Sequence, residues 1–244
     1  MELVSPFTFI YAYLHSPLSP FAFGTSPPLS INNPSAVLAC LFVIHYLNRA
    51  ILSPLRTPSR SKSHAIVLLV GIVFNIVNGP LLGAYLSSPE GLSYLTGAYQ
   101  RPRFWLGVLM WAAGFVGNVV HDEILLLIRQ KKLAEDAKKT PDQIAKEKKK
   151  GEHYAIPHGL LYKYISYPNY FCEWIEWLGF ALAASPLPSF ESWGAFLATI
   201  APPFLFFVAE VFTMVPRAVR GHQWYHDKFP NYPKERKVII PFIF

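Results

Sequence analysis

The chain has 244 residues, of which 52% are hydrophobic and only 15% are charged. Soluble domains carry roughly a quarter charged residues, so this composition indicates a protein surrounded by lipid. It excludes a disordered chain, a disulfide-stabilised scaffold and a collagen-like fibre. The net charge of +7 would suit nucleic acid, but the basic residues lie between apolar segments, and we expect no nucleic-acid partner.

Apolar segments long enough to cross a bilayer recur along the chain. A transmembrane helix needs roughly 20 mostly apolar residues, and four segments clearly qualify: 36–55, 65–86, 104–128 and 193–215. Two weaker candidates are 3–23, which prolines interrupt, and 167–184, which contains two glutamates. We therefore predict an all-α, polytopic transmembrane helix bundle with about six spans, with residues 1–244 forming a single integral-membrane domain.

The basic residues predict how these spans are oriented. Eighteen of the 22 Lys and Arg residues fall in three regions that follow alternate spans: 56–62, 129–153 and 217–237. Basic loops favour the cytosolic side of a membrane. We therefore predict that the loop 129–153 and the C-terminal segment 217–244 are cytosolic.

Polar and ionisable side chains interrupt several of the apolar segments. They include Tyr46, Arg49, Asn118, Asp122, Asn169, Glu173, Glu176, His222 and Tyr225. An ionisable residue inside a span costs at least about 2.5–3.5 kcal/mol on insertion scales and often marks function. A single such residue can be explained by a helix–helix hydrogen bond. This many polar groups instead predict a shared polar cavity that opens to the cytosol.

Common nucleotide and metal motifs do not occur in the sequence. There is no GxGxxG after a predicted strand and no GxxxxGK[ST], so we expect neither a Rossmann fold nor a P-loop. No HExxH motif occurs and the histidines lack metal-ligand spacing, so we expect no metal site. Cys40 and Cys172 lie in apolar stretches, and we interpret both as small buried hydrophobic residues.

Longer motifs resemble those of the steroid 5α-reductase family. The most specific is RAVRGHQWYHDKFPNYPKERKVIIPFIF, which runs to the last residue, and EWIEWLGFALA, YAIPHGLLYKYISYPNYFCE, NGPLLGAYL and VIHYLNRA extend the similarity upstream. The resemblance implies a multi-pass enzyme of the endoplasmic reticulum. It also implies that NADPH is used to reduce the C4–C5 double bond of a 3-oxo-Δ4 steroid. A further helix precedes this region in the family; because this sequence begins at Met1, we expect either that the helix is absent or that the gene start is misplaced.

The resemblance also implies roles for individual residues. The steroid ketone would be held by Glu2 in MELVSPF and Tyr46 in VIHYLNR. The NADPH-binding residues would be Asn118, Asp122, Arg129, Tyr154, Asn169, Glu173, Arg217, His222 and Tyr225. Glu176 would support this site, and Arg60 and Lys62 are further candidates for the phosphates. Two positions depart from the family pattern, because Ala155 stands where the family has an arginine and Gly221 where some members have a second histidine.

These residue types suit the reduction of an enone. A Tyr hydroxyl is a good donor to an oxygen that gains negative charge, and a buried, protonated Glu could reinforce it. An enoyl-thioester reductase and a polyprenal reductase of the same superfamily remain alternatives. A membrane methyltransferase that uses S-adenosylmethionine and an inactive membrane scaffold are alternatives of other classes.

Overall fold

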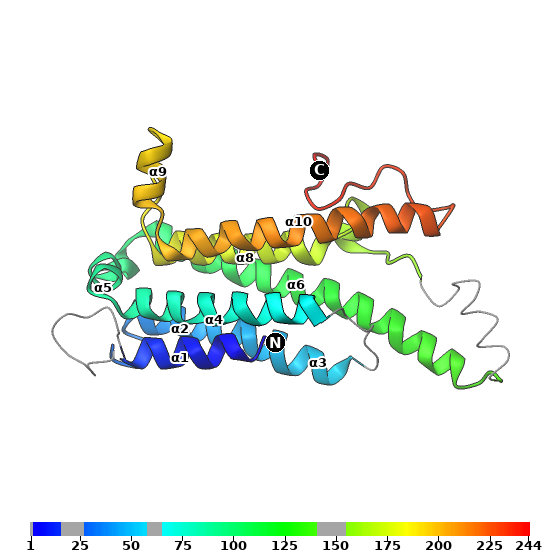
Figure 1. Cartoon of the computed structure of the whole chain (residues 1–244), viewed down its shortest axis with the longest axis horizontal. Helices are drawn as coiled ribbons and strands as arrows, with labels where there is room; N and C mark the ends of the chain where they lie inside the picture. Colours follow the sequence, from blue (N-terminus) through cyan, green and yellow to red (C-terminus); the bar gives the residue numbers. More distant parts are fainter. Residues whose placement is uncertain (1, 16–26, 58–64, 141–154) are drawn as a thin grey trace. The chain divides into compact units, whose positions relative to one another are not determined.

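The computed structural model describes residues 2–15, 27–57, 65–140 and 155–244, and nearly all of its regular structure is helical (Figure 1). The helices are α1 (Val4–His15), α2 (Pro34–Tyr46), α3 (Ser53–Arg56), α4 (Ala65–Ser87), α5 (Pro89–Leu95), α6 (Pro102–Asp136), α8 (Pro168–Ala184), α9 (Trp193–Thr199) and α10 (Pro202–Lys228). A π-helical segment covers Leu47–Leu52, and short 3₁₀ helices cover Ala98–Gln100 and Leu160–Lys163. The prediction of an all-α membrane bundle is confirmed.

Four helices in the described part are long and apolar enough to cross a membrane. They are Pro34–Arg56, Leu68–Ser87, Pro102–Asp136 and Pro202–Lys228. The weaker predicted segments also form helices: α8 has 17 residues and α1 has 12. The end of the first predicted segment, at residues 16–23, lies outside the described residues.

The predicted span 193–215 is wrong at its start. The structure ends α9 at Thr199 and begins α10 at Pro202. Pro202 and Pro203 lack the N–H that would continue the preceding helix, and proline is favoured in the first turn of a new one. The fourth span therefore starts nine residues later than the hydropathy pattern suggested and extends to Lys228.

Residue contacts divide the chain into two compact units. Unit 1 comprises Met1–Arg56, Ser61–Ala113 and Ile175–Glu210, and unit 2 comprises Thr57–Arg60, Gly114–Trp174 and Val211–Phe244. The boundaries between them fall inside α6, α8 and α10.

In unit 1, α1 packs closely along α4 (Figure 1). Gly79 and Gly83 of α4 face this contact, and a Cβ atom at Gly83 would lie only 2.3 Å from the Phe9 carbonyl oxygen. Small residues four positions apart allow helix backbones to approach in a membrane, where van der Waals packing drives association. The GPLLG sequence of α4 therefore fixes where α1 lies.

Aromatic side chains fill the interior of unit 1. The Phe9 and Phe42 rings stack with centroids 4.0 Å apart, joining α1 to α2. Trp177 of α8 lies 5.9 Å from Phe42 and packs edge-on against Phe206 of α10, at 4.7 Å. All four side chains are at most 1% exposed, so this aromatic layer holds four helices together.

Local sequence explains where α2 begins, and the helix ends in an unusual turn. The Asn33 side chain accepts a hydrogen bond from the Ser35 N–H, and Pro34 occupies the first turn. After Tyr46 the backbone becomes π-helical, and the Ser53 N–H donates to the Asn48 carbonyl five residues back. Such turns occur often at functional sites, and this one directly follows a predicted site residue.

In unit 2, the segment after α10 pairs with the chain that leads into α8. The Ser166 N–H donates to the Lys237 carbonyl at 2.9 Å, and the Lys237 N–H donates to the Tyr164 carbonyl at 2.8 Å. These bonds surround a parallel bridge between Ile165 and Lys237. The C-terminal motif is therefore anchored beside the start of α8.

The outer surface of unit 1 is apolar, as a lipid-facing surface should be. Residues of α4 such as Ile66, Leu69, Val70 and Val73 are each at least 60% exposed. Cys40 of α2 is also exposed, so our interpretation of it as a buried residue is wrong, whereas Cys172 is buried. The apolar stretch around Cys40 indicated contact with lipid and not with the protein interior.

Candidate functional site

Two amide–carboxylate pairs join α6 to α8 in unit 2. The Asn118 side chain donates to Glu173 Oε2 at 3.1 Å, and the Asn169 side chain donates to Asp122 Oδ1 at 2.9 Å. Asn118, Asn169 and Glu173 are buried. The four-residue spacings within NVVHD and NYFCE place each donor and acceptor one turn apart on its helix. The structure thus brings four predicted cofactor residues together.

His121 lies between the members of the α6 motif and has a defined tautomer. Its Nδ1 lies 2.6 Å from the Gly117 carbonyl, which only accepts, and its Nε2 accepts from the Leu161 N–H at 3.3 Å. Nδ1 therefore acts as the donor and Nε2 as the acceptor. His121 connects α6 to the 3₁₀ helix Leu160–Lys163.

Tyr162 also contacts His121 in unit 2. Its hydroxyl donates to the His121 carbonyl at 3.4 Å. Burial raises the pKa of Tyr162 well above its ordinary value, and the Asp122 carboxylate raises this pKa further. Tyr162 is therefore a neutral hydrogen-bond donor across the physiological pH range.

The end of α10 is tied to unit 2 through Ser166. The Ser166 hydroxyl shares hydrogen bonds with His222 Nδ1, at 2.6 Å, and with the Tyr232 hydroxyl, at 2.7 Å. The Tyr232 ring stacks on Tyr225, with centroids 5.1 Å apart and planes 15° from parallel. The predicted residues His222 and Tyr225 are thus held by Ser166 and Tyr232, which we did not single out from the sequence.

Gly221 allows Tyr167 to approach α10. A Cβ atom at residue 221 would overlap the Tyr167 hydroxyl. The departure from the family pattern at Gly221 therefore matches a specific neighbour in this chain.

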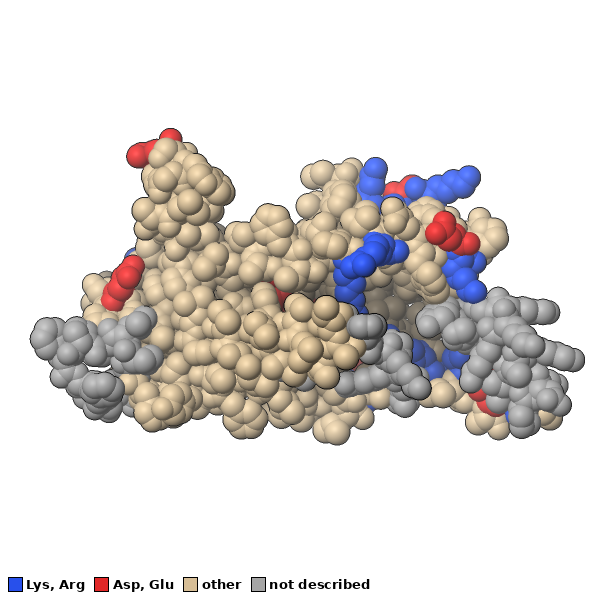
Figure 2. Space-filling model, viewed as in Figure 1, with Lys and Arg blue, Asp and Glu red and all other residues tan. Residues whose placement is uncertain are grey.

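Basic side chains are concentrated on unit 2. Figure 2 shows Lys and Arg over the second half of α10 and the segment that follows it. The predicted residues Arg129 and Arg217 are exposed, so both can reach a ligand's phosphate from the surface. Tyr154, Arg60 and Lys62 lie outside the described residues, and their predicted roles remain predictions.

Arg236 differs from the other basic residues because it is only 4% exposed. Its guanidinium carbon lies 5.0 Å from the Tyr232 ring centroid, and its Nη2 donates to His158 Nδ1 at 3.4 Å. Its Nε and Nη1 atoms are buried and have no hydrogen-bond partner among the residues that the structure describes. A buried guanidinium is costly without an anion, so this arginine is suited to a bound phosphate.

In unit 1, Tyr46 is buried at the end of α2. Its side chain is 4% exposed, and its hydroxyl donates to Asn75 Oδ1 of α4 at 3.5 Å, which is a long hydrogen bond. The Asn75 amide is fixed in turn, because its Nδ2 donates to the Gly71 carbonyl at 2.7 Å. Tyr46 thus has a buried hydroxyl donor whose hydrogen bond to Asn75 is long.

Glu2 differs from the buried, protonated acid that we expected. Its side chain is 29% exposed, and its Oε1 lies 3.7 Å from Arg49 Nε. The two side chains form an ion pair at the surface of unit 1. The pairing follows from the π-helical turn, which carries Arg49.

Glu176 is fully buried and pairs with a residue that we did not predict. Its Oε1 lies 2.7 Å from His45 Nδ1, and the exposed fractions of the two side chains are 0% and 4%. Glu173 and Glu176 are three residues apart in the sequence. The structure gives them partners on different helices, with His45 on α2 and Asn118 on α6.

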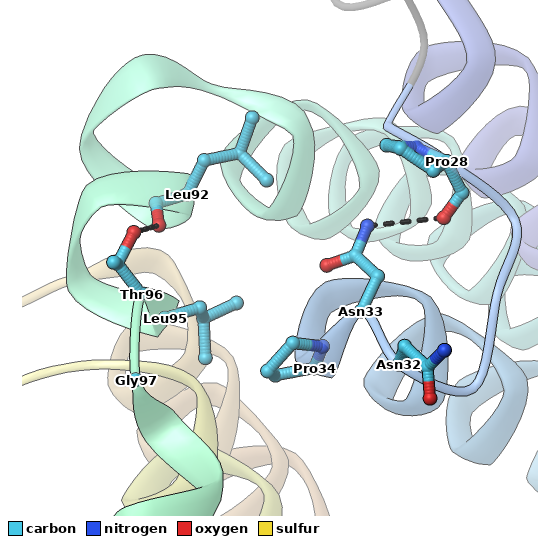
Figure 3. Close-up of a pocket in the computed structure, with 8 residues that line it drawn as sticks. All are labelled: Pro28, Asn32, Asn33, Pro34, Leu92, Leu95, Thr96 and Gly97. Atoms are coloured by element: carbon cyan, nitrogen blue, oxygen red, sulfur yellow. Dashed lines mark hydrogen bonds between the residues drawn. The ribbon is translucent and has the colours of Figure 1, made fainter.

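A cavity of about 330 Å³ in unit 1 contains none of the predicted site residues. Figure 3 shows its lining, which comprises Pro28, Asn32, Asn33, Pro34, Leu92, Leu95, Thr96 and Gly97. Two of the polar side chains there have local partners: Asn33 donates to the Pro28 carbonyl, and Thr96 donates to the Leu92 carbonyl. Among the described residues, no group of three His, Cys, Asp or Glu side chains could hold a metal ion.

Comparison with known proteins gives the family. The model of the 3-oxo-5-alpha-steroid 4-dehydrogenase family matches residues 61–244. The chain belongs to this family. The family name describes oxidoreductases that act on CH–CH bonds of steroids, and it confirms the resemblance to steroid 5α-reductases.

Known proteins that are similar to this chain align over most of their length. An uncharacterised protein of Schizosaccharomyces pombe is 38% identical over 249 residues, covering 100% of this chain and 82% of that protein. The 3-oxo-5-alpha-steroid 4-dehydrogenase 1 of Rattus norvegicus is 32% identical over 213 residues, covering 87% and 69%. The steroid 5-alpha-reductase DET2 of Solanum lycopersicum is 32% identical over 246 residues, covering 94% and 82%.

Within this family member, the structure adds residues that sequence reasoning missed. Asn75 interrupts an apolar span, which is the same signal that selected Asn118. His45 stands next to Tyr46 in the sequence, yet we considered it only as a metal ligand. Ser166, Tyr232 and Arg236 gave no comparable signal, because polar residues in a loop are ordinary.

Proposed function

We propose that this chain is an NADPH-dependent reductase of the C4–C5 double bond of 3-oxo-Δ4 steroids. The amide–carboxylate pairs carry the proposal, because Asn118, Asp122, Asn169 and Glu173 occur together in a chain of the matching family. Amides and carboxylates are suited to ribose hydroxyls and to the carboxamide of a nicotinamide. The proposed substrate class follows from the name of the rat relative.

The residues of unit 2 fit a phosphorylated dinucleotide. Arg236 has buried donor atoms without partners among the described residues, and Arg129 and Arg217 add exposed guanidinium groups. Arginine binds phosphate with two parallel hydrogen bonds. We propose that these three arginines bind the pyrophosphate and 2′-phosphate, while Tyr225 and His222, held by Tyr232 and Ser166, line the remaining surface.

Residues of unit 1 would polarise the steroid ketone. Reduction of an enone consumes one hydride and one proton, and NADPH supplies the hydride when bound. Tyr46 would turn its hydroxyl from the long contact with Asn75 and donate to the ketone oxygen as negative charge develops there. Glu2, which forms an ion pair with Arg49, would also act at the ketone end of the substrate.

The membrane setting follows from the long apolar helices and the distribution of basic residues. We propose that the chain resides in the endoplasmic reticulum membrane with its C-terminus in the cytosol. A cysteine placed at Lys234 should react with a membrane-impermeant maleimide in sealed, right-side-out microsomes. If labelling occurs only after detergent treatment, the C-terminus lies in the lumen and the proposed orientation is wrong.

One experiment tests the reaction and the substrate class. The chain purified in detergent is supplied with NADPH and, separately, a 3-oxo-Δ4 steroid, an enoyl thioester or a polyprenal. We expect NADPH oxidation with the steroid and a product heavier by two hydrogens. Reduction of only the thioester or polyprenal would assign another substrate within the superfamily. Binding of S-adenosylmethionine but not NADPH would reject the reductase.

A further inference from the structure

The buried pair formed by His45 and Glu176 has no role in the function proposed above. Its members come from α2 and α8 within unit 1, and His45 Nδ1 lies 2.7 Å from Glu176 Oε1. Glu176 is 0% exposed, and the His45 side chain is 4% exposed. Neither group can exchange its partner for water.

Such a pair is costly to keep if its only role is to join two helices. Burying two ionisable groups away from water carries a desolvation penalty that their attraction often fails to offset. Apolar side chains of similar volume would join α2 to α8 as well, as the neighbouring Phe42 and Trp177 already do. The pair therefore suggests a chemical role at this position.

The surroundings of the pair connect it to Tyr46. The His45 and Tyr46 rings are in edge contact, with centroids 5.1 Å apart and planes at 72°. Trp177, which follows Glu176 on α8, lies 4.6 Å from the His45 ring and 6.4 Å from the Tyr46 ring. The three rings pack on one another in a water-poor layer, so the orientation of His45 constrains that of Tyr46.

We propose that His45 and Glu176 are positioning residues that fix the Tyr46 ring and place a proton-sharing imidazole–carboxylate pair beside it. When negative charge develops on the oxygen that Tyr46 contacts, a positive imidazole held by Glu176 stabilises that charge through the poorly polarisable layer. This inference rests on the proposed role of Tyr46. It adds a charge pair that acts through Tyr46 and touches neither substrate nor cofactor.

The test separates the charge of the pair from its hydrogen bond. The double variant His45→Gln, Glu176→Gln keeps a neutral hydrogen bond between α2 and α8 but removes the ionisable groups. We expect kcat to fall roughly 10- to 100-fold, because the variant loses the charge that acts through Tyr46, an effect smaller than the roughly 10²–10³ lost with a direct donor to the oxygen. The KM for the ketone, the NADPH dissociation constant and the unfolding temperature should stay close to wild type.

A matched control removes one histidine and one glutamate from the surface of the same unit. His15 at the end of α1 and Glu90 in α5 are both exposed, and His15→Gln, Glu90→Gln should leave kcat unchanged. Wild-type kcat in the buried double variant would show that the pair only joins helices. If that variant unfolds, the single Glu176→Gln variant decides, because wild-type kcat there overturns the inference equally.

Rejection of the role of His45 and Glu176 can be distinguished from rejection of the proposed function. If the wild-type chain reduces neither the steroid nor the enoyl thioester nor the polyprenal, the proposed function itself is rejected. If it reduces one and the double variant matches it, only the role of His45 and Glu176 is rejected.

Discussion

Asn118 of α6 donates a hydrogen bond to the Glu173 carboxylate of α8, and both side chains are buried. One turn away on both helices, Asn169 and Asp122 repeat the arrangement with the donor and acceptor helices exchanged. The two pairs form a compact set of oriented donors and acceptors. Its properties lead to the first prediction.

Replacing Glu173 with glutamine should weaken NADPH binding without unfolding the chain. The amide keeps the shape of the side chain but cannot accept at both of its polar atoms. We expect the dissociation constant to rise roughly tenfold, since a hydrogen bond to a charged group contributes about 1.5–3 kcal/mol. Quenching of intrinsic fluorescence by NADPH measures it, and Glu135→Gln at an exposed position of α6 is the control.

Replacing Tyr46 with phenylalanine should lower turnover while NADPH still binds. The variant loses the hydroxyl that donates to the ketone oxygen, and loss of one such donor costs roughly 10²–10³ in kcat. Tyr11→Phe on the exposed face of α1 is the control, because that side chain is 66% exposed. Unchanged turnover in Tyr46→Phe would remove Tyr46 from the mechanism.

Replacing Arg236 with methionine should weaken binding of NADPH more than binding of NADH. The variant keeps an apolar stem over Tyr232 but loses the buried donors that we assign to a phosphate. An increase of about tenfold in the NADPH dissociation constant is expected, corresponding to about 1.4 kcal/mol. Lys234→Met, an exposed change in the same segment, is the control. An equal rise in the dissociation constants of NADPH and NADH would show that Arg236 does not bind the 2′-phosphate.

Replacing Gly221 with alanine should destabilise unit 2. The new methyl group would overlap the Tyr167 hydroxyl, and overpacking typically costs about 1–3 kcal/mol. Thermal unfolding in detergent should therefore begin several degrees lower. Gly194→Ala in α9 is a matched control, because the nearest atom to its new Cβ lies 4.0 Å away. Tyr167→Phe should restore part of the loss in Gly221→Ala, and failure to do so would contradict the assigned overlap.

Tyr162 should make stability depend on alkaline pH. Its pKa is raised in the folded chain, by burial first and by Asp122 second, from an ordinary value of 10.0. The unfolded chain therefore releases this proton at lower pH than the folded chain does, so stability is complete below pH 10 and falls as pH rises above it. Tyr162→Phe should be less stable at neutral pH because it loses a hydrogen bond, but its unfolding temperature should fall less steeply above pH 10. Parallel slopes for both proteins would contradict this assignment.

The apolar segments of the sequence predicted the long helices well, because membrane spans need uninterrupted apolar runs. The polar residues that interrupt the apolar segments also marked Asn118 and Asp122 as candidate site residues. The break before Pro202 was visible in the sequence, but the averaged hydropathy of residues 193–215 obscured it. The single-domain prediction and the shared polar cavity remain predictions.

The sequence could not predict which partner each polar side chain bonds to. Glu173 and Glu176 are three residues apart on α8, yet one bonds to α6 and the other to α2. Which neighbour a polar side chain meets depends on how helices pack, and that depends on contacts such as Gly83 against Phe9. Glu2 likewise found Arg49 because of a π-helical turn that no residue type in LNRAIL requires.

That π-helical turn has a consequence for engineering the chain. A π turn accommodates one residue more than an α-helix of the same length, so deleting a single residue from Leu47–Leu52 would allow α-helical geometry to continue. Each α-helical residue rotates the chain by about 100°, so a deletion in the α-helical part of α2 would turn α3 about its axis, whereas a deletion inside the π turn removes the extra residue and leaves α2 and α3 close to their present phase. Single-residue deletions within Leu47–Leu52 should therefore be tolerated better than deletions within Pro34–Tyr46.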